Sequence, residues 1–111
     1  MRTFLLNITS MIIYNVTTII EDSIQTEYLN FMHDEHMPEV MATGKFIDCK
    51  LFLLTEPKNE GITYCAQYIT DDTNKLEDYR NEDSPRLQLH FKEKFDGKYV
   101  AFRSVLHLAK P

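Results

Sequence analysis

The chain has 111 residues, of which 43% are hydrophobic and 26% are charged, a balance typical of one soluble globular domain. Seventeen acidic residues against twelve basic ones give a net charge of −5, which disfavours nucleic acid and anionic membranes as partners. No segment is apolar over the length needed to span a bilayer, so we expect a cytoplasmic protein.

Residues 1–10 contain one arginine and a few apolar residues, without the apolar core or cleavage site of a signal peptide. We interpret them as a leader ahead of Met11, outside a single domain over residues 11–109. The two cysteines are too few for a disulfide framework. Cys49 and Cys65 fall on two strands that we expect to pair, where they could approach each other. Free, buried thiols in a reducing compartment are the simpler interpretation.

The first predicted element is a strand over Ile12–Ile20, because this run is rich in β-branched residues. Its apolar residues occupy both parities, which is typical of a strand buried on both faces. Asp22 and Gln25 then have the spacing of a capping box, and a helix follows. The stripe that we expect this helix to bury consists of Ile24, Tyr28, Phe31, Met32 and Glu35.

A proline marks the end of this helix. Met37 precedes Pro38 and should leave the α region, which predicts that the helix ends near His36. Pro38 suits the first turn of a short second helix through Ala42. Gly44 suits the left-handed position that closes it.

The second half of the chain repeats this order. Residues 46–55 and 62–70 are predicted strands joined by a hairpin loop. Asp72 and its neighbours can cap a long helix that runs to residue 95. Ser84-Pro85 predicts a kink or a restart within it. The last predicted strand covers residues 99–108.

The order βαββαβ indicates an α+β, ferredoxin-like fold, in which two helices cover one face of a four-stranded antiparallel sheet. Both parities of the strands are apolar, so the second face of the sheet should also be covered. The same face of a second copy is the simplest cover. We therefore expect a homodimer through the sheet face, a dimeric α/β barrel.

His36 is the candidate catalytic residue. It is predicted at the C-terminal end of a helix, where the partial negative charge of the helix should raise the pKa of the imidazole. Glu35 is close enough in sequence to orient it. Tyr14 and Arg103 are expected near the same end of the sheet, and Tyr68 is a further candidate pocket lining. A histidine, a tyrosine and an arginine around a pocket suit proton abstraction beside a carbonyl.

Other interpretations of these residues stay open. His36 can instead cap helix carbonyls and brace the turn before Pro38. His33 and His36 have a spacing that can share a metal, but no third histidine or cysteine is well placed, so we predict no metal site. We expect no cofactor either, because the sequence has no phosphate-binding glycine loop, nucleophile elbow or paired-cysteine motif.

Three stretches resemble domain-of-unknown-function family 4286. They are MIIYNVT at residues 11–17, EHMPEVMATGKF at 35–46 and KYVAFR at 98–103. The turn after the first helix is also similar to that of the dimeric α/β-barrel proteins, which include cofactor-free monooxygenases and lactone isomerases. The resemblance implies a fold and a dimer without an established activity, and it carries over only His36 as a site residue.

Two hypotheses for function follow. The first is a homodimer that binds a small organic molecule between sheet and helices, with cofactor-free monooxygenase- or isomerase-like chemistry at most. Whether it is an enzyme stays open. The second is a non-catalytic dimeric module that acts on another protein through its surface. A cavity beside His36 would favour the first hypothesis.

Overall fold

The computed structural model describes residues 10–110, so the predicted leader lies almost wholly outside the described residues. The elements follow the predicted βαββαβ order. Strands are β1 (Ile12–Ile20), β2 (Asp48–Leu53), β3 (Ile62–Thr70) and β4 (Tyr99–His107). The first helical layer contains η1 (Asp22–Ile24), α2 (Gln25–Phe31), the π-helical turn η2 (Met32–His36) and α3 (Met37–Ala42). The second contains α4 (Thr73–Asp78), the π-helical turn η3 (Tyr79–Asp83) and α5 (Ser84–Phe95).

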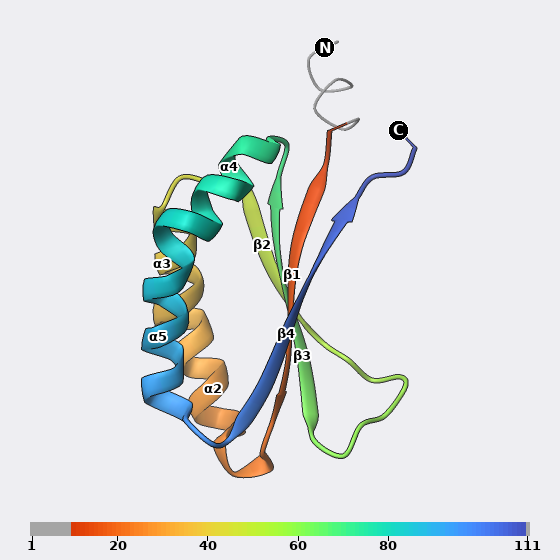
Figure 1. Ribbon diagram of the computed structural model, residues 1–111. Coiled ribbons are helices and arrows are strands. Elements are labelled where there is room, and N and C mark those ends of the chain that lie inside the picture. Colours follow the sequence, from red (N-terminus) through yellow and green to blue (C-terminus); the bar gives the residue numbers. More distant parts are fainter. Residues whose placement is uncertain (1–9, 111) are drawn as a thin grey trace.

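The four strands form one antiparallel sheet in the order β2-β3-β1-β4, and both helical segments lie on the same face of it (Figure 1). The ferredoxin-like prediction is confirmed. In the central register Tyr14 of β1 stands between Tyr68 of β3 and Val105 of β4. Side chains alternate along each strand, so these three residues and every second residue from them face the helices. The residues between them face away. Within residues 10–110, no helix has the length and apolar content required to cross a membrane.

Aromatic side chains fill the space between the helices and the sheet. Tyr28 of α2 packs against Tyr64 of β3, with ring centroids 5.2 Å apart, and Phe31 packs against Phe91 of α5 at 5.9 Å. Side chains three or four residues apart lie on the same side of a helix and present a single stripe to the sheet, which explains this pairing. Glu35 is an exception to the predicted stripe. It is exposed, because the π-helical turn rotates it away from the sheet.

Each helical segment passes through a proline by means of a π-helical turn. Met37 has helical dihedrals (φ −62°, ψ −43°), and its N–H donates to the Met32 carbonyl five residues back. The helix therefore does not end near His36, and that prediction is wrong. Ser84 bonds to the Tyr79 carbonyl in the same way. The wider turn leaves room for the ring of the proline that follows, which has no N–H to donate.

The predicted helix ends are partly observed. Asp22 makes no side-chain cap; the helix begins instead with the short turn η1, after Glu21. The carboxylate of Asp72 accepts a hydrogen bond from the Asn74 amide at 2.8 Å, as its position predicted. Gly44 has φ 74°, which confirms the left-handed position after α3.

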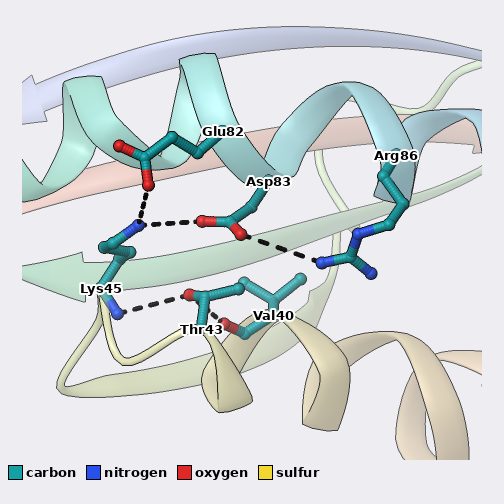
Figure 2. A network of polar contacts seen from close by, with 6 residues as sticks. All are labelled: Val40, Thr43, Lys45, Glu82, Asp83 and Arg86. Carbon is teal, nitrogen blue, oxygen red and sulfur yellow. Dashed lines mark hydrogen bonds and ion pairs between the residues drawn. The ribbon is translucent and has the colours of Figure 1, made fainter.

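A polar network joins the end of α3 to the start of α5 (Figure 2). The Thr43 hydroxyl donates to the Val40 carbonyl at 2.7 Å and accepts from the Lys45 amide at 3.3 Å. The Lys45 ammonium donates to Asp83 at 3.0 Å, and this hydrogen bond raises the pKa of Lys45. Asp83 also pairs with Arg86 at 3.8 Å. The network fixes the α3–β2 connection against the second helical layer.

The two cysteines lie on opposite faces of the sheet. Cys49 stands opposite Tyr68 and faces the helices, whereas Cys65 stands opposite Phe52 and faces away. Both thiols are free. The pairing of β2 with β3 is as predicted, but a register offset of three residues separates the cysteines and prevents the approach that the sequence allowed.

The sheet face away from the helices is apolar at its edges and polar at its centre. Its exposed apolar residues are Phe52, Val100, Phe102 and Leu106. Asn15 lies between Ser104 and Gln67 in the register. It donates to the Ser104 hydroxyl at 3.3 Å and accepts from Gln67 at 3.2 Å. We call this surface the open face.

Gly61 provides a test of close packing at the start of β3. A β-carbon built on Gly61 would lie 2.9 Å from the Ile20 carbonyl oxygen and 2.8 Å from Ile19 Cγ2. Gly61→Ala should therefore destabilise the fold by about 1–3 kcal/mol, because a backbone atom cannot move aside. Urea unfolding gives the value. Glu60→Ala, at an exposed neighbouring position, is the control and should change stability by less than about 0.5 kcal/mol. Equal effects of the two substitutions would contradict the prediction.

Candidate functional site

A cavity of about 270 Å³ lies between the sheet and the helices. Its floor consists of small residues on the helix-facing side of adjacent strands, namely Val16, Thr18, Ala66 and Ala101. Small side chains here leave space that the larger aromatic residues around them do not fill. The cavity therefore arises because the strand register places these small residues next to one another.

Residues from both π-helical turns line this cavity. Met32 and His36 are the first and last residues of η2, while Tyr79 begins η3 and Ser84 follows it. π-Helical turns occur frequently at functional sites. Two such turns that face one hollow make this cavity the candidate site.

His36 is held between aromatic rings. Its imidazole lies 5.8 Å from the Phe31 ring and 5.7 Å from the Phe91 ring, centroid to centroid. Its Nδ1 atom is buried and has no hydrogen-bond partner among the described residues. Burial lowers the pKa of His36 to about 4; Glu39 opposes this shift, while Arg103 adds to it. His36 is therefore neutral at pH 7.

The direction of this shift reverses the expectation from sequence. The sequence places His36 at a helix end, where the helix dipole would raise its pKa. The structure continues the helix into α3, so His36 faces no exposed carbonyls. Desolvation of the imidazolium is then the largest effect.

Tyr68 also lines the cavity. The residue is 2% exposed, and its hydroxyl is buried without a hydrogen-bond partner in the part of the chain that the structure describes. Burial raises the pKa of this phenol well above its ordinary value, so the group is protonated and can donate. Tyr68 stands on β3, an internal strand of the sheet.

Arg103 stands on β4 opposite Val16, so it faces the helices and lines the cavity. The sequence left open which face of the sheet it would occupy. Lys92 of α5 lines the same cavity. Among the described residues, neither cation has a carboxylate within ion-pair distance.

The structure thus brings His36, Tyr68 and Arg103 of the predicted site to one cavity and leaves out Tyr14 and Glu35. The Tyr14 ring lies between Phe46 and Tyr79, at 6.3 and 5.8 Å, and does not line the cavity. It is a core residue. Glu35 is exposed on the outer side of η2 and cannot orient His36.

Several cavity residues were not predicted from the sequence. Ser84, Gln88 and Lys92 line it at intervals of four along α5, and Gln88 donates to the Ser84 hydroxyl at 2.7 Å. This polar spacing, next to the apolar stripe of the same helix, was the available signal. Tyr99 lines the cavity from β4, two positions before Ala101 and four before Arg103.

The weak metal pattern is not assembled by the fold. His33 is 89% exposed and pairs with Asp34, with 2.8 Å between Nδ1 and Oδ1. It therefore points to solvent while His36 faces the cavity. Within residues 10–110 no group of three or more metal-ligating side chains comes together.

Solved structures of similar fold support the architecture. An EthD-like protein from Ralstonia eutropha gives a TM-score of 0.65 at 15% identity, covering 91% of this chain and 94% of that one. SnoaB from Streptomyces nogalater, a cofactor-independent oxygenase, gives 0.64 at 9% identity, covering 92% and 96%. A dimeric ferredoxin-like protein of unknown function from Thermobifida fusca gives 0.55 at 11% identity, covering 87% and 92%. At these identities the likeness shows the fold alone.

The sequence comparisons define the family. No curated protein matches this sequence. The family model described as domain of unknown function DUF4286 matches residues 11–109, which include every element of the sheet and both helical layers. The chain therefore belongs to the DUF4286 family.

Proposed function

We propose that this protein is a cytoplasmic homodimer that binds a small organic molecule in the cavity beside His36. One observation carries the proposal: two residues that line the cavity, His36 and Tyr68, each have a buried polar atom without a hydrogen-bond partner among the described residues. Buried polar groups in proteins are normally satisfied, because an unpaired one costs about 1–3 kcal/mol. A ligand with a complementary polar group would remove that cost.

The chemistry that this site supports is proton transfer. Neutral His36 can accept a proton from an acidic C–H or O–H group of the ligand, and the Arg103 guanidinium can stabilise the anion that forms. Removal of such a proton begins both isomerisation and cofactor-independent oxygenation. SnoaB, described as a cofactor-independent oxygenase, shares the fold and motivates this part of the proposal. The cavity itself is the argument for a ligand.

A thermal-shift screen against a metabolite library tests ligand binding. A ligand at a hundredfold excess over its Kd should stabilise the wild type by about 2.7 kcal/mol, which corresponds to a rise in Tm of roughly 10 °C. The shift should be lost in His36→Ala and kept in His33→Ala, which removes an exposed histidine from the same turn. Absence of any shift that depends on His36 would contradict the proposal and make this residue a structural one.

The homodimer part of the proposal rests on the open face. Phe52, Phe102 and Leu106 are 48%, 57% and 47% exposed in the single chain, on a face that no helix of the described residues covers. Exposed apolar surface of this extent marks an interaction site. A second copy offers the same surface across a two-fold axis. The similar fold from Thermobifida fusca is described as dimeric, which supports the proposal.

The same face also supports the alternative function, a module that contacts a different protein. The row of Ser104, Asn15 and Gln67 would then give that contact polar specificity. The sedimentation experiment described in the Discussion separates the two proposals, because only self-association depends on the concentration of this chain alone.

A further inference from the structure

The formal charges that line the cavity are all positive. Arg103 and Lys92 line it, and no aspartate or glutamate does. The chain as a whole is acidic, with a net charge of −5. Lys45, Lys50, Arg80, Arg86 and Lys94 all form ion pairs with carboxylates. The two cavity cations are left available for an anion from outside the chain.

The interior of the cavity suits a flat, apolar group. Phe91 and Tyr99 line it with ring centroids 4.7 Å apart in an edge arrangement, and Tyr79 and Met32 complete the apolar wall. Aromatic rings and methionine sulfur both make favourable contacts with a bound ring. A cavity of about 150 Å³ holds benzene. The volume of about 270 Å³ therefore has room for one ring or two fused rings.

The cationic groups of the site are exposed to solvent, whereas the Tyr68 hydroxyl is buried. Arg103 is exposed and stands on the edge strand β4, while the buried Tyr68 hydroxyl comes from the central strand β3. A ligand with its charge at the cations would direct its opposite end toward Tyr68.

We propose that the ligand is an aromatic carboxylic acid with a hydroxyl or keto oxygen at the end opposite its carboxylate. This inference rests on the proposed function of the cavity. The carboxylate binds Arg103 and Lys92, the ring packs among the aromatic residues, and the distal oxygen accepts a hydrogen bond from the Tyr68 hydroxyl. Guanidinium groups bind carboxylates through paired hydrogen bonds, and such charged bonds are about twice as strong as neutral ones.

Calorimetric titration with three probes of equal ring size tests the inference. Hydroxynaphthoate carries both polar ends, naphthoate lacks the hydroxyl, and naphthol lacks the carboxylate. We expect hydroxynaphthoate to bind about tenfold or more tighter than naphthol, the change in affinity expected for one charged hydrogen bond. Arg103→Gln should weaken both carboxylates by about tenfold and leave naphthol unchanged.

Matched variants keep the result interpretable. Arg80→Gln removes an arginine that lies over Tyr14, outside the cavity, and should leave all three affinities unchanged. Lys92→Gln, at an exposed position of α5, provides a second test of the cationic end. Tyr68→Phe should abolish the advantage of hydroxynaphthoate over naphthoate, whereas Tyr14→Phe should preserve it.

The opposing outcomes are distinct. Equal affinity for naphthol and the carboxylates, or an equal loss of all three in Arg103→Gln, would overturn the anionic ligand class while leaving ligand binding in the cavity intact. No binding of any probe at millimolar concentration would also overturn this class. Failure of the proposed function is read separately, as the absence of metabolite shifts that depend on His36.

Discussion

Lowering the pH from 7 to 4 is expected to remove roughly 3 kcal/mol of folding stability through His36 alone. The unfolded chain binds a proton at this imidazole below pH 6.5, but the folded protein binds it only near pH 4. Between these values the unfolded state holds more protons, so stability falls as the pH falls. Above pH 6.5 the imidazole is neutral in both the folded and the unfolded state, so His36 no longer makes the stability depend on pH.

Urea unfolding at several pH values measures this effect. The stability of wild type minus that of His36→Gln should decrease by roughly 3 kcal/mol between pH 7 and pH 4. His33→Gln, which removes an exposed histidine, is the control and should follow the wild-type curve. Parallel curves for wild type and His36→Gln would contradict the burial of a neutral imidazole.

Other charged groups near His36 require their own variant. Glu39 and His90 face it from α3 and α5, and Arg103 faces it from β4. Glu39 Oε1 lies 3.4 Å from His90 Nδ1, within ion-pair distance. His90→Gln removes that contact. The His36 contribution should persist in this background, because its main cause is burial and not the ion pair.

Placing charge on the open face should convert the proposed homodimer into a monomer. In Phe102→Glu combined with Phe52→Glu, each subunit loses two apolar anchors and gains two carboxylates that the interface would bury. A buried phenylalanine contributes about 1.5–3 kcal/mol, so the dimer should weaken by about a thousandfold or more. Sedimentation velocity at micromolar concentration detects the change directly.

The design includes a control and a clear contrary result. Leu89→Glu changes an equally exposed apolar residue, 57% exposed on α5, and should leave the dimer intact because the helix lies on the other side of the sheet. A well-folded wild-type monomer at micromolar concentration would contradict the homodimer. The open face would then be assigned to a different protein.

The strands were predictable because their signal is local. β1 and β3 begin and end at the residues that the β-branched runs and turn residues indicated. β2 is shorter than predicted and covers only Asp48–Leu53. The flanking residues Ile47 and Leu54 still donate a backbone hydrogen bond to β3, but they lie outside the regular strand. With two helical patterns between strands at the right places, the order βαββαβ leaves few alternatives.

The helix ends were less predictable because packing overrides local preference. A residue before proline normally leaves the helix, yet Met37 and Ser84 stay helical. Both segments bury an apolar stripe against the sheet on each side of the proline, and a wider turn preserves that burial. The result is one π-helical turn in each segment, and residues of both turns line the cavity.

The sequence by itself determined the element order and the paired strands, and it identified His36, Tyr68 and Arg103 among the residues that line the cavity. Only the tertiary structure decided that Arg103 faces the helices, that Tyr14 belongs to the core and that His36 is neutral. The physical reason is that strand register and burial arise from contacts between residues far apart in the chain. A pKa depends on that burial, so no local pattern could give its direction.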